Sequence, residues 1–488
     1  MKKWLSFLMA LTLMLGMTSF ASAEQVETIE VAYMLTMNAA EQRDMVQEEL
    51  NRLLDEKGAG FHVNLVCIDF ASWSTQVNLM LTDGSVDLFN CSFMPAMSVL
   101  ADSGSLAPLD DLLATYGQGI LDALGDNIEC ARIGGVIYGT PKIDAFSSTQ
   151  LFFMSKEIAD EVGIDPDTIV DYATLTEALK QVKAAYPDMT MIANGNGGAY
   201  FNIVGLDYLG TESPLGCLVL EGGDGSLQVV NGYETDIFKE MLDYAKQWNE
   251  LGFFMKDPLN AQDGAFAYLS NGQAFGPFGQ YCTEEVGRSV QEKGNGMELY
   301  ACQLMPQAYS TTNNVTAMTW CVPALSPRKE SAVKFLNLLY TDADIANLLC
   351  NGIEGVHYVV TEEGNIDFPE GLDAFNTGWP SGMGTFWPNI TITYPWKPDP
   401  ADVYQSWLDS NATCLKSPAL GFTFDPTNVA DEISACSTIV DKYVNSLLLD
   451  VGDTETLYAE FLSDLEAAGM DAIIAEKQAQ LDAWQSAQ

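Results

Sequence analysis

Three tryptophans in one long stretch without helical periodicity are the side chains of this sequence best suited to bind a ligand. Trp379, Trp387 and Trp396 occur there together with Phe386 and Tyr394. Loops rarely concentrate large apolar rings. This density therefore predicts that one or two of the rings line a binding cleft, where an aromatic face stacks on an apolar ligand face. The remaining rings are predicted to form a small core beneath the C-terminal helices.

Two polar side chains follow a short apolar run and are a second group of candidate ligand contacts. Asn90 and Ser92 come directly after residues 86–89, which are predicted to form a strand. Ligands of open parallel sheets bind at the carboxyl ends of the strands, so both residues are predicted to lie at a binding rim. The alternative is a turn in which Asn and Ser bond only to the local backbone.

Motifs of the common enzyme classes are missing from the sequence. It contains no G-x-S-x-G, H-E-x-x-H, G-x-x-x-x-G-K-[ST] or EF-hand pattern, and it has only 2 His. The glycine-rich run at 194–198 lacks the spacing of a dinucleotide fingerprint and is predicted to be a plain loop. We predict no catalytic residue, no metal site and no cofactor. Paired glycosidase carboxylates stay open as an alternative, because their separation in space is not readable from sequence.

The composition narrows the class of ligand. The chain has 488 residues, 22 Lys+Arg against 67 Asp+Glu, and a formal charge of −45. Such a chain repels nucleic acid and anionic lipid, and it has few basic groups for phosphate or sulfate. With 48% apolar residues it is not a disordered acidic tail. A neutral solute is favoured, followed by a peptide or a cationic solute that the acidic field would attract.

The first residues resemble a signal for export. Lys2 and Lys3 precede an apolar run at 5–17, and the small residues 21–23 precede Glu24. A basic start, a short apolar core and a small-residue cleavage site define a secretory signal peptide, predicted here as residues 1–23. The alternative is an uncleaved membrane anchor, for which the apolar run is short.

The ten cysteines do not form a recognisable framework. The first is Cys67, which excludes a lipid-modified cysteine near the predicted cleavage site, and no C-x-x-C pair occurs. Most of the cysteines are predicted to be small buried apolar residues.

The periodicity of the first hundred residues predicts the elements that position the polar rim. Apolar residues alternate at 29–35 and 61–67, and 86–89 is a short apolar run, whereas the apolar residues at 46–54 and 77–81 repeat at helical spacing. Strand, helix, strand, helix and strand in this order predict a parallel α/β sheet with right-handed crossovers.

A second unit is predicted to begin near Pro141. It contains a compact apolar run at 151–154 and amphipathic helices at 175–182 and 237–248. The end of the chain, 454–484, is predicted to be helical because its apolar residues form one stripe.

Four segments together resemble a known family: 72–93 (SWSTQVNLMLTDGSVDLFNCSF), 133–164 (IGGVIYGTPKIDAFSSTQLFFMSKEIADEVGI), 271–281 (NGQAFGPFGQY) and 320–342 (WCVPALSPRKESAVKFLNLLYTD). They are similar to extracellular solute-binding proteins of ABC importers, of the carbohydrate-type family 1. Three further segments, 351–358, 417–426 and 475–484, are similar to a subgroup with a distinctive C-terminal domain of unassigned role.

The resemblance implies an α/β, two-lobed periplasmic-binding-protein-like fold (type II) with a hinge, plus C-terminal helices. The implied division is a first lobe formed by 24–141 and 317–400, a second lobe formed by 142–316, and a C-terminal helical region, 401–488, that packs on the lobes. A ligand that contacts both lobes favours the closed state, because only that state gains both sets of contacts.

Further candidate residues come from the same resemblance. Asp144 stands where family members place a polar residue against sugar hydroxyls, and Tyr281 stands where they present a stacking aromatic ring. The alternatives are a surface or capping carboxylate and an ordinary core ring. Trp320 begins the segment 320–342, which resembles the family's return crossing between the lobes, and it is either a ligand contact or a core residue.

The implied function is that of the substrate-binding component of an ABC transporter. Such a protein captures a small solute, here expected to be a neutral oligosaccharide, and delivers it to membrane permease subunits, without nucleic-acid partners. The expected location is the periplasm or the cell surface; family members from Gram-positive bacteria usually carry a lipobox cysteine, and this chain has Ala-Ser-Ala instead. The alternatives are a secreted glycoside-cleaving enzyme and a binding protein for peptides or cationic solutes.

Overall fold

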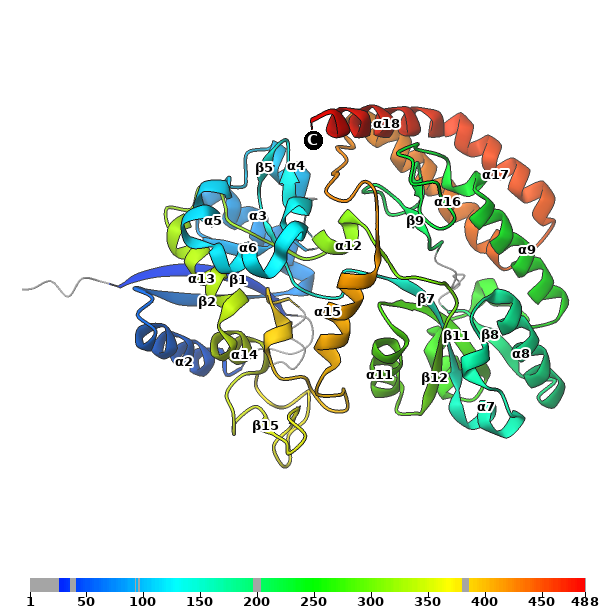
Figure 1. Ribbon diagram of the computed structural model, residues 1–488, viewed down its shortest axis with the longest axis horizontal. Helices are drawn as coiled ribbons and strands as arrows, with labels where there is room; N and C mark the ends of the chain where they lie inside the picture. The colour runs from blue at the N-terminus through cyan, green and yellow to red at the C-terminus, as the bar shows by residue number, and fades with distance from the viewer. Residues whose placement is uncertain are drawn as a thin grey trace, which may run out of the picture.

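A computed structural model describes residues 26–35, 41–92, 94, 97–195, 203–379 and 386–487. The predicted signal peptide lies outside the described residues, as does part of the glycine-rich run at 194–198. The described chain folds into two α/β lobes with a set of helices at its C-terminal end (Figure 1). The predicted fold class is therefore confirmed.

The first lobe is built on a five-stranded sheet. Its strand order is β2 (Phe61–Asp69), β1 (Glu27–Leu35), β3 (Leu88–Asn90), β14 (Thr319–Cys321) and β6 (Thr140–Pro141). β1 pairs in parallel with both β2 and β3, as the periodicity predicted, whereas β14 runs antiparallel to β3 and β6. β14 thus belongs to the same sheet as β1, although almost three hundred residues separate the two strands.

Helices cover this sheet with the apolar stripes that the sequence predicted. α2 (Arg43–Glu56) buries Val46, Leu50 and Leu54, which are spaced four residues apart on one face. The remaining helices of the lobe are α3 (Trp73–Asp83), α4 (Met97–Asp102), α5 (Asp110–Tyr116), α6 (Gln118–Leu124), α13 (Lys329–Thr341) and α14 (Ala343–Asn351).

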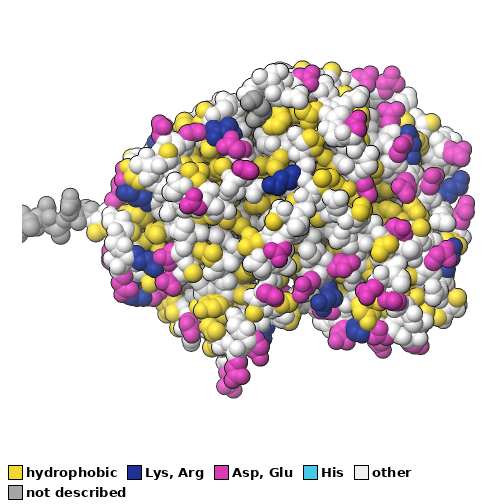
Figure 2. All heavy atoms as spheres, viewed as in Figure 1, with side chains coloured by type: hydrophobic (Ala, Val, Ile, Leu, Met, Phe, Trp, Pro, Cys, Tyr) yellow, Lys and Arg dark blue, Asp and Glu magenta, His cyan; other side chains and the backbone are white. Residues whose placement is uncertain are grey.

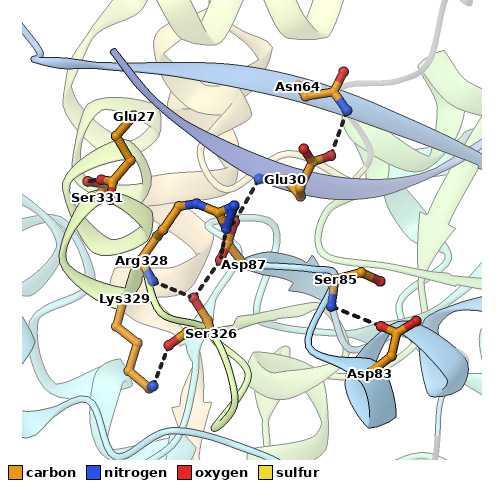
Figure 3. Close-up of polar contacts among 10 residues, drawn as sticks. All are labelled: Glu27, Glu30, Asn64, Asp83, Ser85, Asp87, Ser326, Arg328, Lys329 and Ser331. Atoms are coloured by element: carbon orange, nitrogen blue, oxygen red, sulfur yellow. Dashed lines mark hydrogen bonds and ion pairs between the residues drawn. The ribbon is translucent and has the colours of Figure 1, made fainter. Parts of the chain in front are cut away.

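The buried carboxylate of Asp87 fastens the segment before α13 to the sheet of the first lobe (Figure 3). Asp87 is fully buried and accepts the Glu30 backbone N–H at 2.8 Å. It also accepts the Ser326 hydroxyl at 2.6 Å and lies 3.1 Å from Arg328 Nη1. Because Ser326 and Arg328 precede α13, one carboxylate holds together three segments of the lobe that are far apart in sequence.

The second lobe is built on a four-stranded sheet. Its order is β12 (Leu299–Gln303), β7 (Thr149–Ser155), β11 (Ala274–Tyr281) and β8 (Thr190–Ala193). β7 is buried along its whole length, as expected for a central strand. The helices of this lobe are α7 (Lys156–Val162), α8 (Tyr172–Ala185), α9 (Asp236–Glu250), α10 (Ala265–Ser270) and α11 (Glu284–Asn295), and two short strands, β9 (Leu206–Asp207) and β10 (Leu218–Val219), pair with each other.

The chain passes between the lobes three times. The first crossing is 142–148, and the second follows β13 (Tyr309–Ser310) through α12 (Thr312–Thr316). The third contains α15 (Val403–Thr413), which leads to β17 (Leu415–Lys416), and β17 pairs in parallel with β13. Figure 1 shows α12 and α15 in the middle of the molecule, between the two sheets.

The C-terminal helices form an arc on the outside of the second lobe, next to α9 (Figure 1). They are α16 (Ala430–Leu448), α17 (Thr454–Ala468) and α18 (Met470–Ala487). The predicted helical segment 454–484 is two helices, because Gly469 between them adopts φ 105°, a conformation that ends a helix. Phe461 and Ile473 belong to the same core as Phe152 of the second sheet.

Two further properties of the described chain bear on the predictions. Eight of the ten cysteines are buried and the other two, Cys67 and Cys414, are half-buried, in agreement with their predicted role as small apolar residues. Within the described ranges, no helix is both long and apolar enough to cross a membrane.

Candidate ligand-binding site

Two adjoining cavities lie where the lobes and the crossing segments meet. One has a volume of about 250 Å³ and the other about 350 Å³, and Asn313 of α12 lines both. Figure 1 places α12 centrally, between the two lobes. A ligand that filled both cavities would therefore touch the hinge as well as the lobes, which is the arrangement that couples binding to lobe closure.

The smaller cavity brings together four parts of the chain. Its first-lobe wall follows β3 and continues into α4, its floor is α12, and the opposite wall comes from the second lobe and the start of the C-terminal region. The residues that line it are Cys91, Ser92, Met94, Met97, Ser98, Gly210, Thr312, Asn313, Thr316, Ala317, Thr319, Phe422, Thr423 and Phe424.

The larger cavity lies against the second lobe. Its wall includes the second-lobe segment before and after β9 and the last residues of β11, closed by the crossing segments. The residues that line it are Ser148, Ile203, Val204, Gly205, Leu206, Tyr208, Glu212, Gln280, Tyr309, Thr311, Asn313 and Asn314.

The chemistry of both cavities is that of uncharged hydrogen bonding. Hydroxyl and amide side chains predominate, aromatic rings, methionines and aliphatic side chains supply the apolar area, and Glu212 is the one charged residue among the described lining residues. This contrasts with the exterior, where acidic side chains are spread over both lobes in the view of Figure 2. Such a lining suits a ligand with many hydroxyls and apolar C–H faces, and it offers a phosphate or sulfate group no cation.

The two rim residues predicted after β3 take different positions. Ser92 lines the smaller cavity, and its hydroxyl donates to Ala317 O at 3.2 Å. Asn90 is buried beneath it, where its side-chain oxygen accepts the Ser92 N–H at 2.7 Å and its amide donates to Phe386 O at 3.3 Å. Ser92 therefore lies at the cavity wall, whereas Asn90 bonds to the local backbone and holds Ser92 in place.

Asp144 lies on the first crossing and does not line either cavity. Its carboxylate pairs with Lys142, whose side chain is only 2% exposed, and accepts the Ala145 N–H at 2.8 Å. Its backbone oxygen accepts the Asn411 amide at 2.7 Å, which ties the crossing to α15. The carboxylate neutralises a buried cation, and its removal would leave the Lys142 charge buried and unpaired.

Tyr281 ends β11 next to the larger cavity, but its neighbour Gln280 is the residue that lines this cavity. Successive side chains of a strand point to opposite faces, so the Tyr281 ring lies on the other side. There it packs edge to face against Phe153, with 5.9 Å between ring centroids, and its hydroxyl accepts the Gln291 amide at 2.6 Å.

Trp320, Trp379 and Trp387 lie in the core of the first lobe. They are 0%, 1% and 1% exposed, and all three belong to the apolar cluster of the lobe together with Tyr33. Trp320 Nε1 donates to Phe386 O at 2.7 Å, and Trp379 Nε1 donates to Leu349 O at 3.2 Å. The rings thus support the sheet from which the cavity wall extends.

Trp396 is half-buried and lies in a smaller cluster. Its ring packs against Phe368 with 4.4 Å between centroids, and its Nε1 donates to Asn351 Oδ1 at 2.7 Å. Like the other three tryptophans, it is not among the described residues that line the two cavities.

Several lining residues were not singled out from the sequence. The polar run 311–314 (TTNN) sits at a crossing, and its composition was a usable signal. The pair Phe422 and Phe424 gave a weaker one, since alternating aromatic residues also occur in ordinary strands. Tyr208 and Gln280 reach the cavity only through tertiary structure.

Comparison with known proteins agrees with this architecture. Residues 54–352 match the family model described as bacterial extracellular solute-binding protein, and residues 418–486 match a domain of unknown function, DUF3502. A carbohydrate ABC transporter substrate-binding protein of Streptococcus pneumoniae is 25% identical over 453 residues, which are 90% of this chain and 87% of that protein.

Solved structures show the same fold. The N-glycan transport solute-binding protein of Streptococcus pneumoniae superposes with a TM-score of 0.80 at 22% identity, covering 93% of this chain and 98% of that one. A solute-binding protein of Bifidobacterium longum infantis, described as HMO-binding and ABC-transporter-associated, superposes with a TM-score of 0.63 at 16% identity, covering 94% and 99%. The matched family model spans more than half of the sequence, and the chain therefore belongs to the bacterial extracellular solute-binding proteins.

Proposed function

We propose that this chain is the substrate-binding component of an ABC importer, which captures a neutral oligosaccharide between its two lobes and delivers it to a membrane permease. The observation that carries the proposal is the pair of adjoining cavities lined by uncharged hydrogen-bonding groups and aromatic rings from both lobes and the hinge. A protein with this task works outside the cytoplasmic membrane, in the periplasm or at the cell surface, after removal of residues 1–23.

The names of its relatives support a glycan as the ligand. The Streptococcus pneumoniae relative is a carbohydrate transport protein, and the N-glycan transport protein with the same fold has been solved with Man1GlcNAc and with Man5GlcNAc. The combined cavities are large enough for part of an oligosaccharide, and longer ligands would extend along the lobe interface.

The enzyme alternative has less support than binding. Within the described cavity walls, Glu212 is the one carboxylate, whereas glycoside hydrolysis requires two carboxyl groups that flank the scissile bond. A peptide or cationic ligand would find one carboxylate there and no basic group for its own carboxyl end.

A glycan panel tests the proposal directly. The full chain without residues 1–23 is titrated by calorimetry with Man5GlcNAc, Man1GlcNAc, neutral oligosaccharides of other composition, and peptides, and each mixture is examined for hydrolysis products by mass spectrometry. We expect micromolar or tighter binding of one glycan class, about −8 kcal/mol or more negative, without product. Hydrolysis would favour the enzyme, and binding of peptides alone would refute the glycan proposal.

Single variants then locate the ligand. We expect Asn313→Ala and Gln280→Ala to weaken binding at least tenfold, because each removes hydrogen bonds from a cavity wall. Gln405→Ala, on the outer part of α15, is the control, since its side chain bonds only to Asp409. Asp144→Ala and Tyr281→Ala belong in the same series as predicted ligand contacts, and a loss of affinity at unchanged melting temperature would support contact of that residue with the ligand.

A further inference from the structure

The C-terminal helical region contributes directly to the smaller cavity. Phe422 and Phe424 line it together with Thr423, although both rings are only 4% exposed. Gly210 of the second lobe faces Phe424 so closely that a Cβ on this glycine would lie 3.4 Å from Phe424 Cβ. The segment that contains Gly210 therefore rests on the C-terminal region.

A buried lysine of α18 binds the same segment. The side chain of Lys477 is fully buried, and its Nζ donates to Tyr208 O at 2.7 Å, to Gly216 O at 2.7 Å and to Thr211 Oγ1 at 2.8 Å. All three acceptors lie in residues 208–216. An amino group so far from solvent is retained only where its hydrogen bonds are satisfied, and here one segment satisfies all of them.

The segment that Lys477 holds contains a strained residue. Leu209 has φ 52°, a left-handed conformation that is unfavourable for a side chain other than glycine. Two bonds flank it, because Asp207 Oδ1 accepts the Leu209 N–H at 2.9 Å and Lys477 binds the carbonyl oxygen just before it. Strained backbone persists where surrounding contacts over-determine it, and such positions are frequent at ligand clamps.

The strained segment is also part of the second-lobe wall of both cavities. Tyr208 and Glu212 line the larger cavity, and Gly210 lines the smaller one. Gly216 at the far end has φ 78°, and a Cβ there would lie 3.1 Å from Lys477 Cδ, so a glycine makes room for the lysine. A shift of this segment by about 1 Å would change the shape of both cavities together.

We propose that Lys477 of the C-terminal domain is a positioning residue for ligand binding, which holds the 207–216 segment in the shape that forms the second-lobe wall of the cleft. This inference rests on the proposed function for its ligand and assigns a task to a domain whose role is unassigned. The domain then stabilises the shape of the binding site, through the hydrogen bonds of the Lys477 amino group to the 207–216 segment.

Hydrogen–deuterium exchange of the ligand-free full chain tests the positioning itself. We expect Lys477→Met to raise exchange in peptides covering 207–217 at least tenfold above the rest of the second lobe. Leu481→Ala is the matched control, because Leu481 is a fully buried residue one turn further along α18 whose apolar side chain contributes to the same core but donates no hydrogen bond to the segment. Equal exchange in 207–217 for the two variants would overturn the proposal.

Binding of Man5GlcNAc, measured well below the melting temperature of each variant, provides the second readout. We expect a Kd at least tenfold weaker for Lys477→Met and a Kd within twofold of the parent for Leu481→Ala. If Lys477→Met does not fold, Lys477→Gln, which keeps an N–H donor, replaces it, and we expect its Kd to be weaker than that of Leu481→Ala. An unchanged Kd in the lysine variants would refute the proposal. Failure of the parent protein to bind any glycan would refute the proposed function, while the exchange experiment still decides the role of Lys477.

Discussion

The indole rings of Trp320 and Trp387 are stacked, with 5.2 Å between centroids and 13° between planes. Trp320 belongs to β14, and Trp387 belongs to the long connection before the third crossing. The Trp320 Nε1 also donates to Phe386 O at 2.7 Å, whereas Trp387 Nε1 has no hydrogen-bond partner among the described residues. The stack therefore joins the connection to the sheet, and one of its two polar groups is unsatisfied.

This difference predicts unequal stability losses for the two rings. Trp320→Phe removes a buried hydrogen bond and leaves Phe386 O with one donor fewer, so we expect a loss of about 2–4 kcal/mol in the free energy of unfolding. Trp387→Phe removes part of a buried ring but also an unsatisfied N–H, so we expect a smaller loss of about 1–2 kcal/mol. Urea denaturation measures both. A larger loss for Trp387→Phe would contradict the assignment, and a changed glycan Kd at unchanged stability would mean that the ring contacts the ligand.

The Asp87 carboxylate predicts a second stability effect. Asp87→Asn keeps the size of the side chain but weakens its bonds to Ser326, Arg328 and the Glu30 N–H, and we expect a loss of about 3 kcal/mol in the free energy of unfolding. Asp83→Asn is the control, because Asp83 is a surface residue whose carboxylate accepts the Ser85 N–H within its own turn (Figure 3). Similar urea midpoints for Asp87→Asn and the parent would refute this role.

His357 predicts a loss of stability on mild acidification. Its Nδ1 accepts the Ile353 N–H at 2.8 Å, which requires the neutral ring, and burial lowers the pKa of His357 below its ordinary 6.5. The unfolded chain then binds more protons than the folded one, so stability falls as pH decreases from about 7 through 6.5. His357→Gln should flatten this part of a urea-midpoint profile, with His62→Gln as the control for losing the other histidine. A parent profile that is flat in this range would contradict the prediction.

Lys477 extends the same rise of stability with pH to more alkaline values. Burial lowers the pKa of Lys477 to about 7, whereas an unfolded lysine titrates near 10.5. Between these values the unfolded chain binds more protons, so this group makes stability rise with pH above about 7.

The buried thiols have the opposite effect on stability. Burial raises the pKa of Cys130 and Cys302 to about 12 from 9.0, which lowers stability as pH rises above about 9. We expect a maximum near pH 9 that shifts to lower pH in Lys477→Met; a maximum at the same pH in both proteins would refute this.

Closure of the two lobes predicts a change in overall size on binding. The smaller cavity takes its walls from both lobes and adjoins the larger one on the second lobe, so a ligand that fills both gains its full set of contacts only when the lobes approach each other. We expect small-angle scattering to show a smaller radius of gyration for the monomeric protein after saturation with a bound glycan. Identical scattering curves with and without a verified tight ligand would argue against capture between the lobes.

The order of strands and helices was readable from the sequence because it depends on local periodicity. The alternation at 29–35 and 61–67 predicted β1 and β2. The helical spacing of Val46, Leu50, Leu53 and Leu54 predicted α2, in which all of these residues but the half-buried Leu53 are buried. The resemblance of whole segments predicted the family and the two-lobed fold, which the family match and the superpositions confirm.

Only the tertiary structure decided which residues line the cavities. Ser92, Asn313 and Phe424 meet in one cavity although more than a hundred residues separate each from the next, and no local pattern encodes such a meeting. The face of β11 that meets the cavity depends on strand pairing, because a shift of one residue exchanges Gln280 and Tyr281. The sequence identified the tryptophans as large apolar side chains, but it did not decide whether they contact a ligand or pack in a core. Either position removes the same apolar surface from water, so only tertiary packing makes the difference.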